Sequence, residues 1–439
     1  MIPQARILIA ARNDEMAGPL SEGLDQMGWR TVTARGPFAA EAALSDLGVE
    51  AVIIDATEGD DDAEALARRL RDLAAPRRIP IVGIGAPGAQ APGDAFDLRL
   101  LPPVSPTQVA ARLENLLRTT LAEEAFRLRQ ETFSQLGVRL QDPEANPDPL
   151  RILAIGEPNP QFLGLSNSLE ALGARVVGAF TSYTAFDFLH ASEFDAVVLW
   201  GGESSDSASA IAVGMRRNSR LYHIPIFLYL KNPETMTAAE ACGRGVSDIA
   251  YASTPDADVA LRLIEMARNC RRQSTIRSAL ECARSLPLMD KDTGLFTPEV
   301  FNRHIERLRA SSAERDRPLS LCALRIRPTE AVEEARRSGW LEKAFPQLGS
   351  MVSRLVRIED CAARLGPDRF GVALPGTPAD VAQAVAERIA AVISRTAFDA
   401  GQGRAPLVLE FDIDAFEVCH PGQLEQALSR VSELALGDA

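Results

Sequence analysis

The stretch RILIA, Arg6–Ala10, returns 145 residues later as RILAI, Arg151–Ile155. The same offset relates three further pairs of segments: GLDQMGWRTVTA with SLEALGARVVGA, EAVIID with DAVVLW, and IPIVGI with IPIFLY. Similarity at one fixed offset is the signature of a repeated structural unit. The sequence therefore predicts two copies of one domain in tandem, and the acidic, proline-rich segment LQDPEANPDPL separates them.

Each copy alternates short apolar runs with amphipathic segments. In the first copy we predict strands over Arg6–Ala10, Arg30–Ala34, Ala51–Asp55 and Ile79–Ile84. Continuous apolar strands are typical of a parallel sheet that is buried on both faces. The alternation predicts a doubly wound (βα)5 sandwich in each copy, with any ligand chemistry at the carboxyl ends of the strands.

The bulk composition excludes several classes of protein. A chain of 439 residues predicts two to four domains, and its net charge of −13 argues against a direct nucleic-acid partner, because binding phosphates needs surplus cations. We find neither an apolar run long enough for a membrane span nor a signal peptide, so we expect a cytoplasmic protein. The six cysteines form no C-x-x-C and the four histidines have no ligand spacing, so we expect neither disulfides nor a metal site.

The alternation, with Asp55 ending the third predicted strand, resembles the receiver domains of response regulators. In that family an acidic pair holds Mg²⁺, the strand-end Asp accepts a phosphoryl group, and a hydroxyl residue and a Lys assist. The resemblance places these other positions on Ala11, Arg12, Gly85 and Pro102. Too few oxygen ligands remain for a hard cation. Asp55 is either a phosphoacceptor, with a replacement oxygen from Asp14, or a strand-end carboxylate that solvates a loop.

The second copy departs further from the receiver pattern. Its strand-end position is Trp200, its acidic pair is Gly156 and Glu157, and the Lys position falls near Thr254. The resemblance implies a pseudo-receiver that acts as an adaptor or dimerisation module. After this copy, the apolar spacing predicts one long helix that extends into a basic stalk.

From Met289 onward, MDKDTGLFTPEVFNRHIERL resembles the opening of GGDEF domains, the diguanylate cyclases that make cyclic di-GMP from two GTP. A strand LSLCALRI, a helix, the hairpin CAARLGPDRFGVALPG and the helix ADVAQAVAERIAAVI follow in that family's ferredoxin-like order. We therefore predict an α/β chain with the receiver–receiver–GGDEF architecture of PleD-type regulators. Its parts are receiver-like domain 1 (1–140), receiver-like domain 2 (150–272), a helical stalk (273–288) and a degenerate GGDEF-like palm domain (289–439).

The residues that the resemblance aligns with catalysis are replaced. Arg325 and Arg327 occupy the metal-binding strand end, where the family has carboxylates. The signature hairpin consists of Gly366, Pro367, Asp368, Arg369 and Phe370. Pro367 fixes the backbone and lacks an N–H donor, and a single carboxylate does not support a two-metal mechanism. The guanine-reading positions fall on Glu333 and Glu342, and the Lys expected near ALSRVSELA is absent. We predict no catalytic residues, no metal and no cofactor.

One motif of the family is retained. Arg357 and Asp360 form an R-x-x-D pair before the signature; the resemblance implies an allosteric site for cyclic di-GMP, the I-site, with Arg388 as a third residue and Arg309 or Arg315 as a secondary arginine. Arg offers bidentate donors to phosphate and a flat face to guanine, and Asp accepts from guanine. The alternative is an ion pair on the surface that stabilises the fold only slightly.

Three hypotheses follow for the whole chain. The leading one is a catalytically inactive cyclic di-GMP effector that signals through protein partners of its receiver domains. The second is an active diguanylate cyclase regulated by phosphorylation of Asp55, and the third is a ligand-free scaffold. Because intercalated cyclic di-GMP commonly bridges two domains in this family, the resemblance is also compatible with a homodimer.

Overall fold

The structure is a computed structural model that describes residues 5–57, 60–75, 77–85, 95–102, 104–144, 146–201, 206–218, 220–399 and 406–418. The segment ALSRVSELA, where the sequence lacks the expected Lys, lies outside these residues. The chain divides into two compact units, one of residues 1–120 and 145–275 and the other of residues 121–144 and 276–439. Among the described residues, none of the helices combines the length and the apolar character that crossing a bilayer requires.

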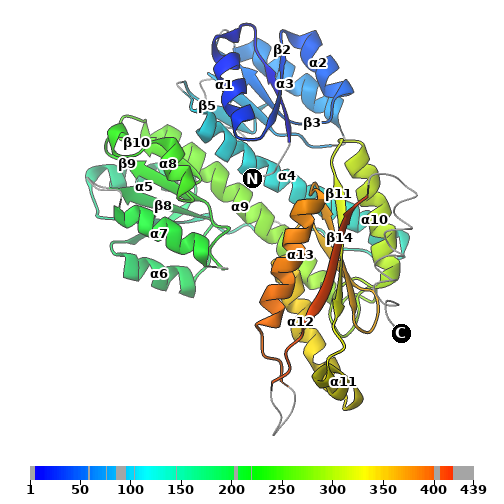
Figure 1. Cartoon of the computed structure of the whole chain (residues 1–439). Coiled ribbons are helices and arrows are strands. Elements are labelled where there is room, and N and C mark those ends of the chain that lie inside the picture. Colours follow the sequence, from blue (N-terminus) through cyan, green and yellow to red (C-terminus); the bar gives the residue numbers. More distant parts are fainter. Residues whose placement is uncertain are drawn as a thin grey trace. The chain divides into compact units, whose positions relative to one another are not determined.

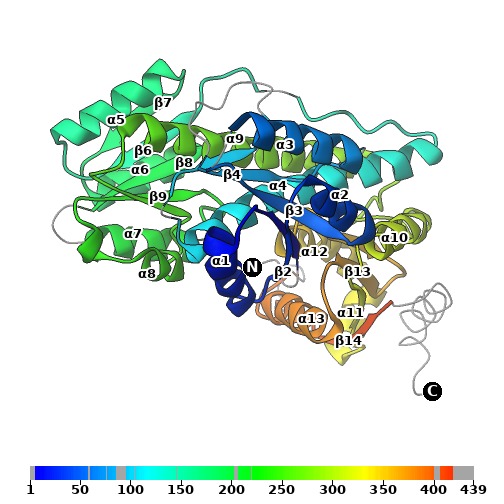
Figure 2. The same cartoon turned by 90° about the horizontal axis from the view of Figure 1, so that it is seen from above.

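The first copy is a parallel five-stranded sheet in the order β2-β1-β3-β4-β5, the order of flavodoxin-like doubly wound domains (Figure 1). Its strands are β1 (Arg6–Ala10), β2 (Arg30–Ala34), β3 (Val49–Asp55), β4 (Ile81–Ile84) and β5 (Leu98–Leu100). Its helices are α1 (Asp14–Gln26), α2 (Pro37–Asp46), α3 (Asp60–Ala74) and α4 (Pro106–Gln135). Helices α1 and α4 pack on one face of the sheet, and α2 and α3 on the other (Figure 2).

The second copy repeats this topology, with the order β7-β6-β8-β9-β10. Its strands are β6 (Arg151–Ile155), β7 (Arg175–Ala179), β8 (Ala196–Gly201), β9 (Ile226–Leu230) and β10 (Asp248–Tyr251). Its helices are α5 (Pro160–Ala171), α6 (Ser182–Ala191), α7 (Asp206–Arg217), the short η1 (Pro233–Thr235), α8 (Ala238–Gly243) and α9 (Asp256–Cys282). The predicted pair of (βα)5 domains is confirmed.

A buried group of charges joins the two copies within the first unit. Arg112 of α4 pairs with Asp248 of β10, at 3.4 Å, and with Glu265 of α9. Asp248 also accepts from Arg262 of α9, at 2.5 Å, and from Gln108 of α4, at 2.9 Å. Burial alone would raise the pKa of Asp248, but the two guanidinium groups outweigh it and lower that pKa. The contact is a compensated charge cluster between the two repeats.

The second unit contains a four-stranded antiparallel sheet in the order β12-β13-β11-β14, the ferredoxin-like arrangement that the sequence predicts. Its strands are β11 (Leu319–Ile326), β12 (Cys361–Arg364), β13 (Arg369–Pro375) and β14 (Phe411–Glu417). Its helices are the short η2 (Ala283–Ser285), α10 (Pro298–Ala313), α11 (Glu330–Arg337), α12 (Leu341–Leu355) and α13 (Ala379–Ser394). Helices α11, α12 and α13 share one apolar core, and α10 belongs to the core on the opposite face.

The C-terminal half of α4 is part of this second unit. Ala122, Phe126 and Phe133 lie in the same apolar cluster as the buried face of α10. The ring of Phe133 meets that of Phe296 edge to face, with centroids 5.8 Å apart. The predicted domain boundary at residue 140 assigns all of α4 to the first domain, whereas residues 121–144 group with the C-terminal unit because their apolar side chains complete its core.

Candidate functional site

The signature segment is the tight turn between β12 and β13. The turn is closed by the Leu365 N–H, which donates to the Arg369 carbonyl at 2.8 Å. On the neighbouring strand, the Ile326 N–H donates to the Asp368 carbonyl at 2.9 Å, so the turn is fixed against the end of β11. The antiparallel register places Arg325 of β11 directly opposite Arg369 of β13. Phe370, the next residue along the strand, is buried in the core.

Three arginines surround the one carboxylate of this turn. Asp368 lies 3.8 Å from Arg325, 3.8 Å from Arg336 and 3.7 Å from Arg369, each measured between a guanidinium nitrogen and a carboxylate oxygen. Like charges near a divalent ion repel it by several kcal/mol at the effective dielectric of a protein surface, roughly 4 kcal/mol per unit charge at about 4 Å. The local field therefore opposes the binding of a metal ion.

Arg327, the second basic residue at this strand end, has acidic partners of its own. Its Nε lies 2.6 Å from Asp412 of β14, and its Nη1 lies 3.5 Å from Glu410. Glu333, aligned with a guanine-reading position, pairs with Arg336 at 3.0 Å. Within the described ranges, no group of three His, Cys, Asp or Glu side chains is arranged to hold a metal ion.

The R-x-x-D pair forms a closed turn between α12 and β12. The Arg357 N–H donates to Asp360 Oδ2 at 2.7 Å, and the Asp360 N–H donates to the Arg357 carbonyl at 3.3 Å. The residue Asp360 is only 4% exposed, and among the described residues its Oδ1 has no hydrogen-bond partner. In contrast, 53% of the Arg357 side chain is exposed, and Glu359 is 3.9 Å away. The turn thus presents the arginine to solvent and turns the aspartate inward.

The third predicted ligand residue lies beside the same turn. Arg388 of α13 donates from Nη2 to the carbonyl of Leu355, at 3.2 Å. Leu355 is the last residue of α12 and precedes Arg357 by two positions. Arg388 is itself exposed. Two exposed guanidinium groups therefore flank one short segment, an arrangement that can bind phosphate groups. Arg315, one of the two secondary candidates, instead pairs with Glu124 of α4.

The buried carboxyl of Asp360 has an unusual electrostatic environment. Its pKa is raised to about 7, because burial and the neighbouring Glu359 outweigh the Arg357 N–H and the charges of Arg357 and Arg129, which act in the opposite direction. Arg129 comes from α4, and its Nη2 donates to the carbonyl oxygen of Asp360. The sequence does not predict this contact; the only signal available is the apolar periodicity around Arg129, which does not identify the surface that the helix covers.

The end of strand β3 is the predicted phosphorylation position of the first copy. Asp55 ends β3, and its Oδ1 accepts from the N–H and the hydroxyl of Thr57, at 3.1 and 2.7 Å. A Cβ at Gly85 would lie 2.4 Å from the Thr57 methyl group. The methyl group therefore fills the space that a side chain at position 85 would need. Pro102 follows β5 and is exposed.

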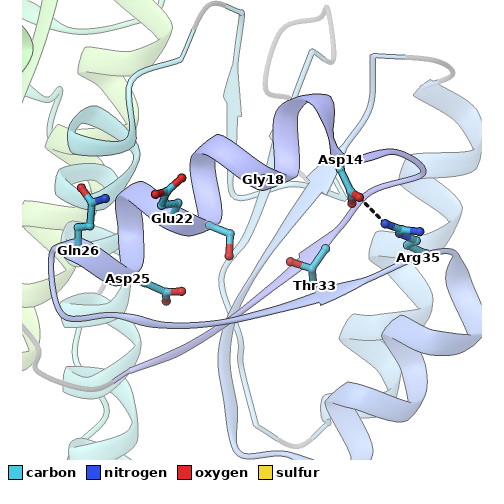
Figure 3. Close-up of a pocket in the computed structure, with 8 residues that line it drawn as sticks. Asp14, Gly18, Glu22, Asp25, Gln26, Thr33 and Arg35 are labelled. Atoms are coloured by element: carbon cyan, nitrogen blue, oxygen red, sulfur yellow. Dashed lines mark hydrogen bonds and ion pairs between the residues drawn. The ribbon is translucent and has the colours of Figure 1, made fainter.

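Asp14, the predicted replacement ligand, has a basic partner. Figure 3 shows its carboxylate directed at Arg35, with which it forms an ion pair. Both residues line an open depression of about 830 Å³ between α1 and β2. Asp25, another lining residue, accepts from the N–H and the hydroxyl of Thr31, both at 2.9 Å. These two carboxylates are engaged in the local fold.

In the second copy an aromatic group occupies the equivalent strand end. Trp200 stacks on Tyr229 of β9, with centroids 4.6 Å apart and planes at 18°, and meets Phe162 edge to face. A Cβ at Gly156 would lie 2.4 Å from the Trp200 Cβ. Packed rings thus stand at the strand end that corresponds, at the offset of 145 residues, to Asp55 of the first copy.

Comparison with known protein families gives a match within the C-terminal unit. Residues 288–435 match the family described as diguanylate cyclase, GGDEF domain. The C-terminal domain is a GGDEF domain. The chain as a whole is similar to the response regulator PleD of Caulobacter vibrioides, with 21% identity over 403 residues that cover 90% of this chain and 87% of PleD.

Solved structures of related domains align with parts of the chain. The GGDEF domain is similar to that of FimX from Pseudomonas aeruginosa, with 16% identity, 34% of this chain and 94% of that chain covered, and a TM-score of 0.31. The GGDEF domain of DgcB from Caulobacter crescentus, in complex with c-di-GMP, is 17% identical, with 35% of this chain and 92% of that chain covered and a TM-score of 0.31. A receiver domain of an HD domain-containing protein from Pseudomonas fluorescens Pf-5 is 15% identical, with 31% of this chain and 96% of that chain covered and a TM-score of 0.27.

Proposed function

We propose that this chain is a cyclic di-GMP effector whose GGDEF domain does not synthesise the ligand. The arrangement around Asp368 carries the proposal. Three guanidinium groups lie within 3.8 Å of the one carboxylate in the signature turn, where a cyclase needs a Mg²⁺ site. Without metal ions to neutralise the triphosphate, attack of one GTP on another has no compensation for the developing charge.

The ligand site in this proposal consists of Arg357, Asp360 and Arg388. Support comes from the two exposed guanidinium groups beside the 355–360 segment, which suit the two phosphates of a cyclic dinucleotide. Asp360 fixes the turn by accepting from the Arg357 N–H, and its buried Oδ1 has no hydrogen-bond partner in the part of the chain that the structure describes. In its departures from the GGDEF pattern the chain resembles the effector PopA.

The same proposal extends to the partners. The two receiver-like domains transmit the signal through protein contacts, because Trp200 and its packed neighbours occupy the phosphorylation position of the second copy. A homodimer bridged by intercalated cyclic di-GMP is the expected ligand-bound form. We expect this to take place in the cytoplasm, with partner proteins determining where the complex gathers.

Isothermal titration calorimetry on the full chain tests the proposal. Wild-type protein should bind cyclic di-GMP, and Arg357→Gly should abolish binding. Arg337→Gly is a matched control, because Arg337 lies in the same domain, is 71% exposed and pairs with Glu334 in the same helix. Failure of the wild-type protein to bind cyclic di-GMP would refute the proposal.

An active cyclase controlled at Asp55 is the second candidate, and the match to the diguanylate cyclase family favours it. Incubation of the full chain with GTP and Mg²⁺, with and without acetyl phosphate, distinguishes the two. We expect no cyclic di-GMP above background in either condition. Product that depends on Mg²⁺ would instead identify the cyclase. A ligand-free scaffold predicts that Arg357→Gly leaves partner recruitment intact.

A further inference from the structure

Arg129 of α4 is a buried cation whose hydrogen bond is to the R-x-x-D turn. It belongs to the part of α4 that packs within the C-terminal unit, and only 8% of the residue is exposed. Its Nη2 donates to the carbonyl oxygen of Asp360. Phe126 and Phe133, on the same helix, are buried in the core of this unit and hold the helix in place. A guanidinium group with so little access to water is costly unless nearby acceptors and anions compensate it.

The turn and the start of β12 supply part of the compensation. The pKa of Arg129 is lowered, because burial outweighs the opposing effect of Cys361, Asp360 and Glu359. In return Arg129 is one of the two cations that oppose the burial of the Asp360 carboxyl; the other is Arg357. Three residues further along α4, the Thr132 hydroxyl makes a second buried polar contact, with His304 Nδ1 at 3.0 Å. The turn and the helix therefore depend on each other electrostatically.

We propose that Arg129 is a positioning residue of the cyclic di-GMP site and that it couples occupancy of the site to helix α4. The inference rests on the proposed function, because it concerns the same ligand site. Removing the guanidinium leaves the Asp360 carbonyl without its donor and the buried carboxyl without one of its two counter-charges. The turn then no longer holds Arg357 in one orientation, so the ligand must order the turn when it binds.

The coupling follows from the length of the helix. Helix α4 is continuous from Pro106 to Gln135, and its first half belongs to the receiver-like unit. A ligand that fixes the 357–360 turn also fixes its hydrogen bond to Arg129. The second half of α4 then opens less often, and its amide hydrogens exchange more slowly. Arg129 thus connects the ligand site to the segment that leads into the receiver-like domains.

Calorimetry with cyclic di-GMP on the full chain tests the positioning role. Arg129→Met fills the same volume without a charge and should bind about tenfold more weakly than wild type. Arg129→Lys keeps a donor and should recover part of that loss. Arg127→Met is the matched control, because Arg127 is two residues away on the same helix, is 49% exposed and pairs with Glu131; its affinity should equal that of wild type. Equal affinities for Arg129→Met and wild type would overturn the inference.

Hydrogen exchange on the wild-type protein tests the coupling without any variant. Cyclic di-GMP should slow exchange in residues 121–135 as well as in the turn, and unchanged exchange in that helix would contradict the coupling even if Arg129→Met failed to fold. The effect in 121–135 should disappear in Arg129→Met at saturating ligand and persist in Arg127→Met. Absence of any wild-type binding refutes the proposed function, whereas wild-type binding with no response of α4 refutes only this inference.

Discussion

Replacing Asp248 by Ala should destabilise the receiver-like unit far more than an ordinary surface substitution. The Asp248 side chain is fully buried and lies between Arg262, at 2.5 Å, and Arg112, at 3.4 Å. It also accepts from Gln108. Removing the carboxylate leaves two buried guanidinium groups without their shared anion. Breaking a buried ion pair in this way costs about 3–5 kcal/mol, most of it from the uncompensated charge.

Asp258→Ala is the matched control for this prediction. Asp258 pairs with the same Arg262, at 3.5 Å and four residues away in the same helix, but 23% of its side chain is exposed. Such a helical pair contributes about 0.3–0.5 kcal/mol. The two variants thus remove one carboxylate each from a single guanidinium group, and we expect their free energies of unfolding to differ by several kcal/mol because only one carboxylate is buried.

Urea unfolding followed by tryptophan fluorescence measures the difference. The chain has three Trp residues, and a Trp340→Phe background leaves Trp29 and Trp200, both in the receiver-like unit. Because the pKa of Asp248 is lowered, its stabilising contribution is present above the ordinary Asp range and is lost as the pH falls through its lower folded value. If Asp248→Ala lowered the free energy of unfolding by less than about 1 kcal/mol, or if both variants lowered it equally, the buried charge cluster would not stabilise the receiver-like unit.

Three further predictions concern other parts of the chain. Gly156→Ala should destabilise the second copy by a few kcal/mol, because φ is +144° and the new Cβ would lie 2.4 Å from Trp200. Gly18→Ala should instead stabilise the first copy by about 0.5–1 kcal/mol, because Gly18 lies within α1 and its new Cβ would meet open space. Thermal unfolding measures both changes. Phe133→Ala should cost the C-terminal unit about 3–5 kcal/mol in urea unfolding, because the ring is 1% exposed. The pKa of Asp360 is raised to about 7, so between about pH 4 and 7 the folded state holds a proton that the unfolded state loses. As the pH rises through this range, the free energy of unfolding of the wild type should therefore fall relative to that of Asp360→Asn. Parallel pH profiles of the two proteins would contradict this.

The strands of the receiver-like domains could be predicted because their signal is local. A buried parallel strand must be apolar on both faces, so RILIA can be recognised as a strand, and β1 has the predicted bounds. Its repeat RILAI forms β6. The fourth strand begins at Ile81 rather than at the predicted Ile79, because Pro80 lacks the N–H that a ladder requires. Strand ends depend on such details of hydrogen bonding, which apolar patterning does not contain.

The role of α4 could not be predicted from the same kind of signal. Its apolar positions indicate a helix with a buried face, but they do not say that Phe126 and Phe133 pack in a domain whose remaining residues begin 140 or more positions later. The surroundings of Asp360 could not be predicted for the same reason. Its carbonyl oxygen accepts from Arg129, a partner 231 residues away along the chain, and neither residue signals the other in the sequence.

The signature turn places three cations around one carboxylate, so a single substitution would not make it favourable for a metal ion. Arg325 and Arg369 lie opposite each other on β11 and β13, and Arg336 approaches the same carboxylate from α11. Replacing any one of them with a carboxylate leaves two cations within about 4 Å of Asp368, and each of these repels a divalent ion. The R-x-x-D turn has no residue in common with this group, since β12 lies between them. The proposed lack of a metal site and the proposed ligand turn therefore rest on separate residues, and each can be tested without changing the other.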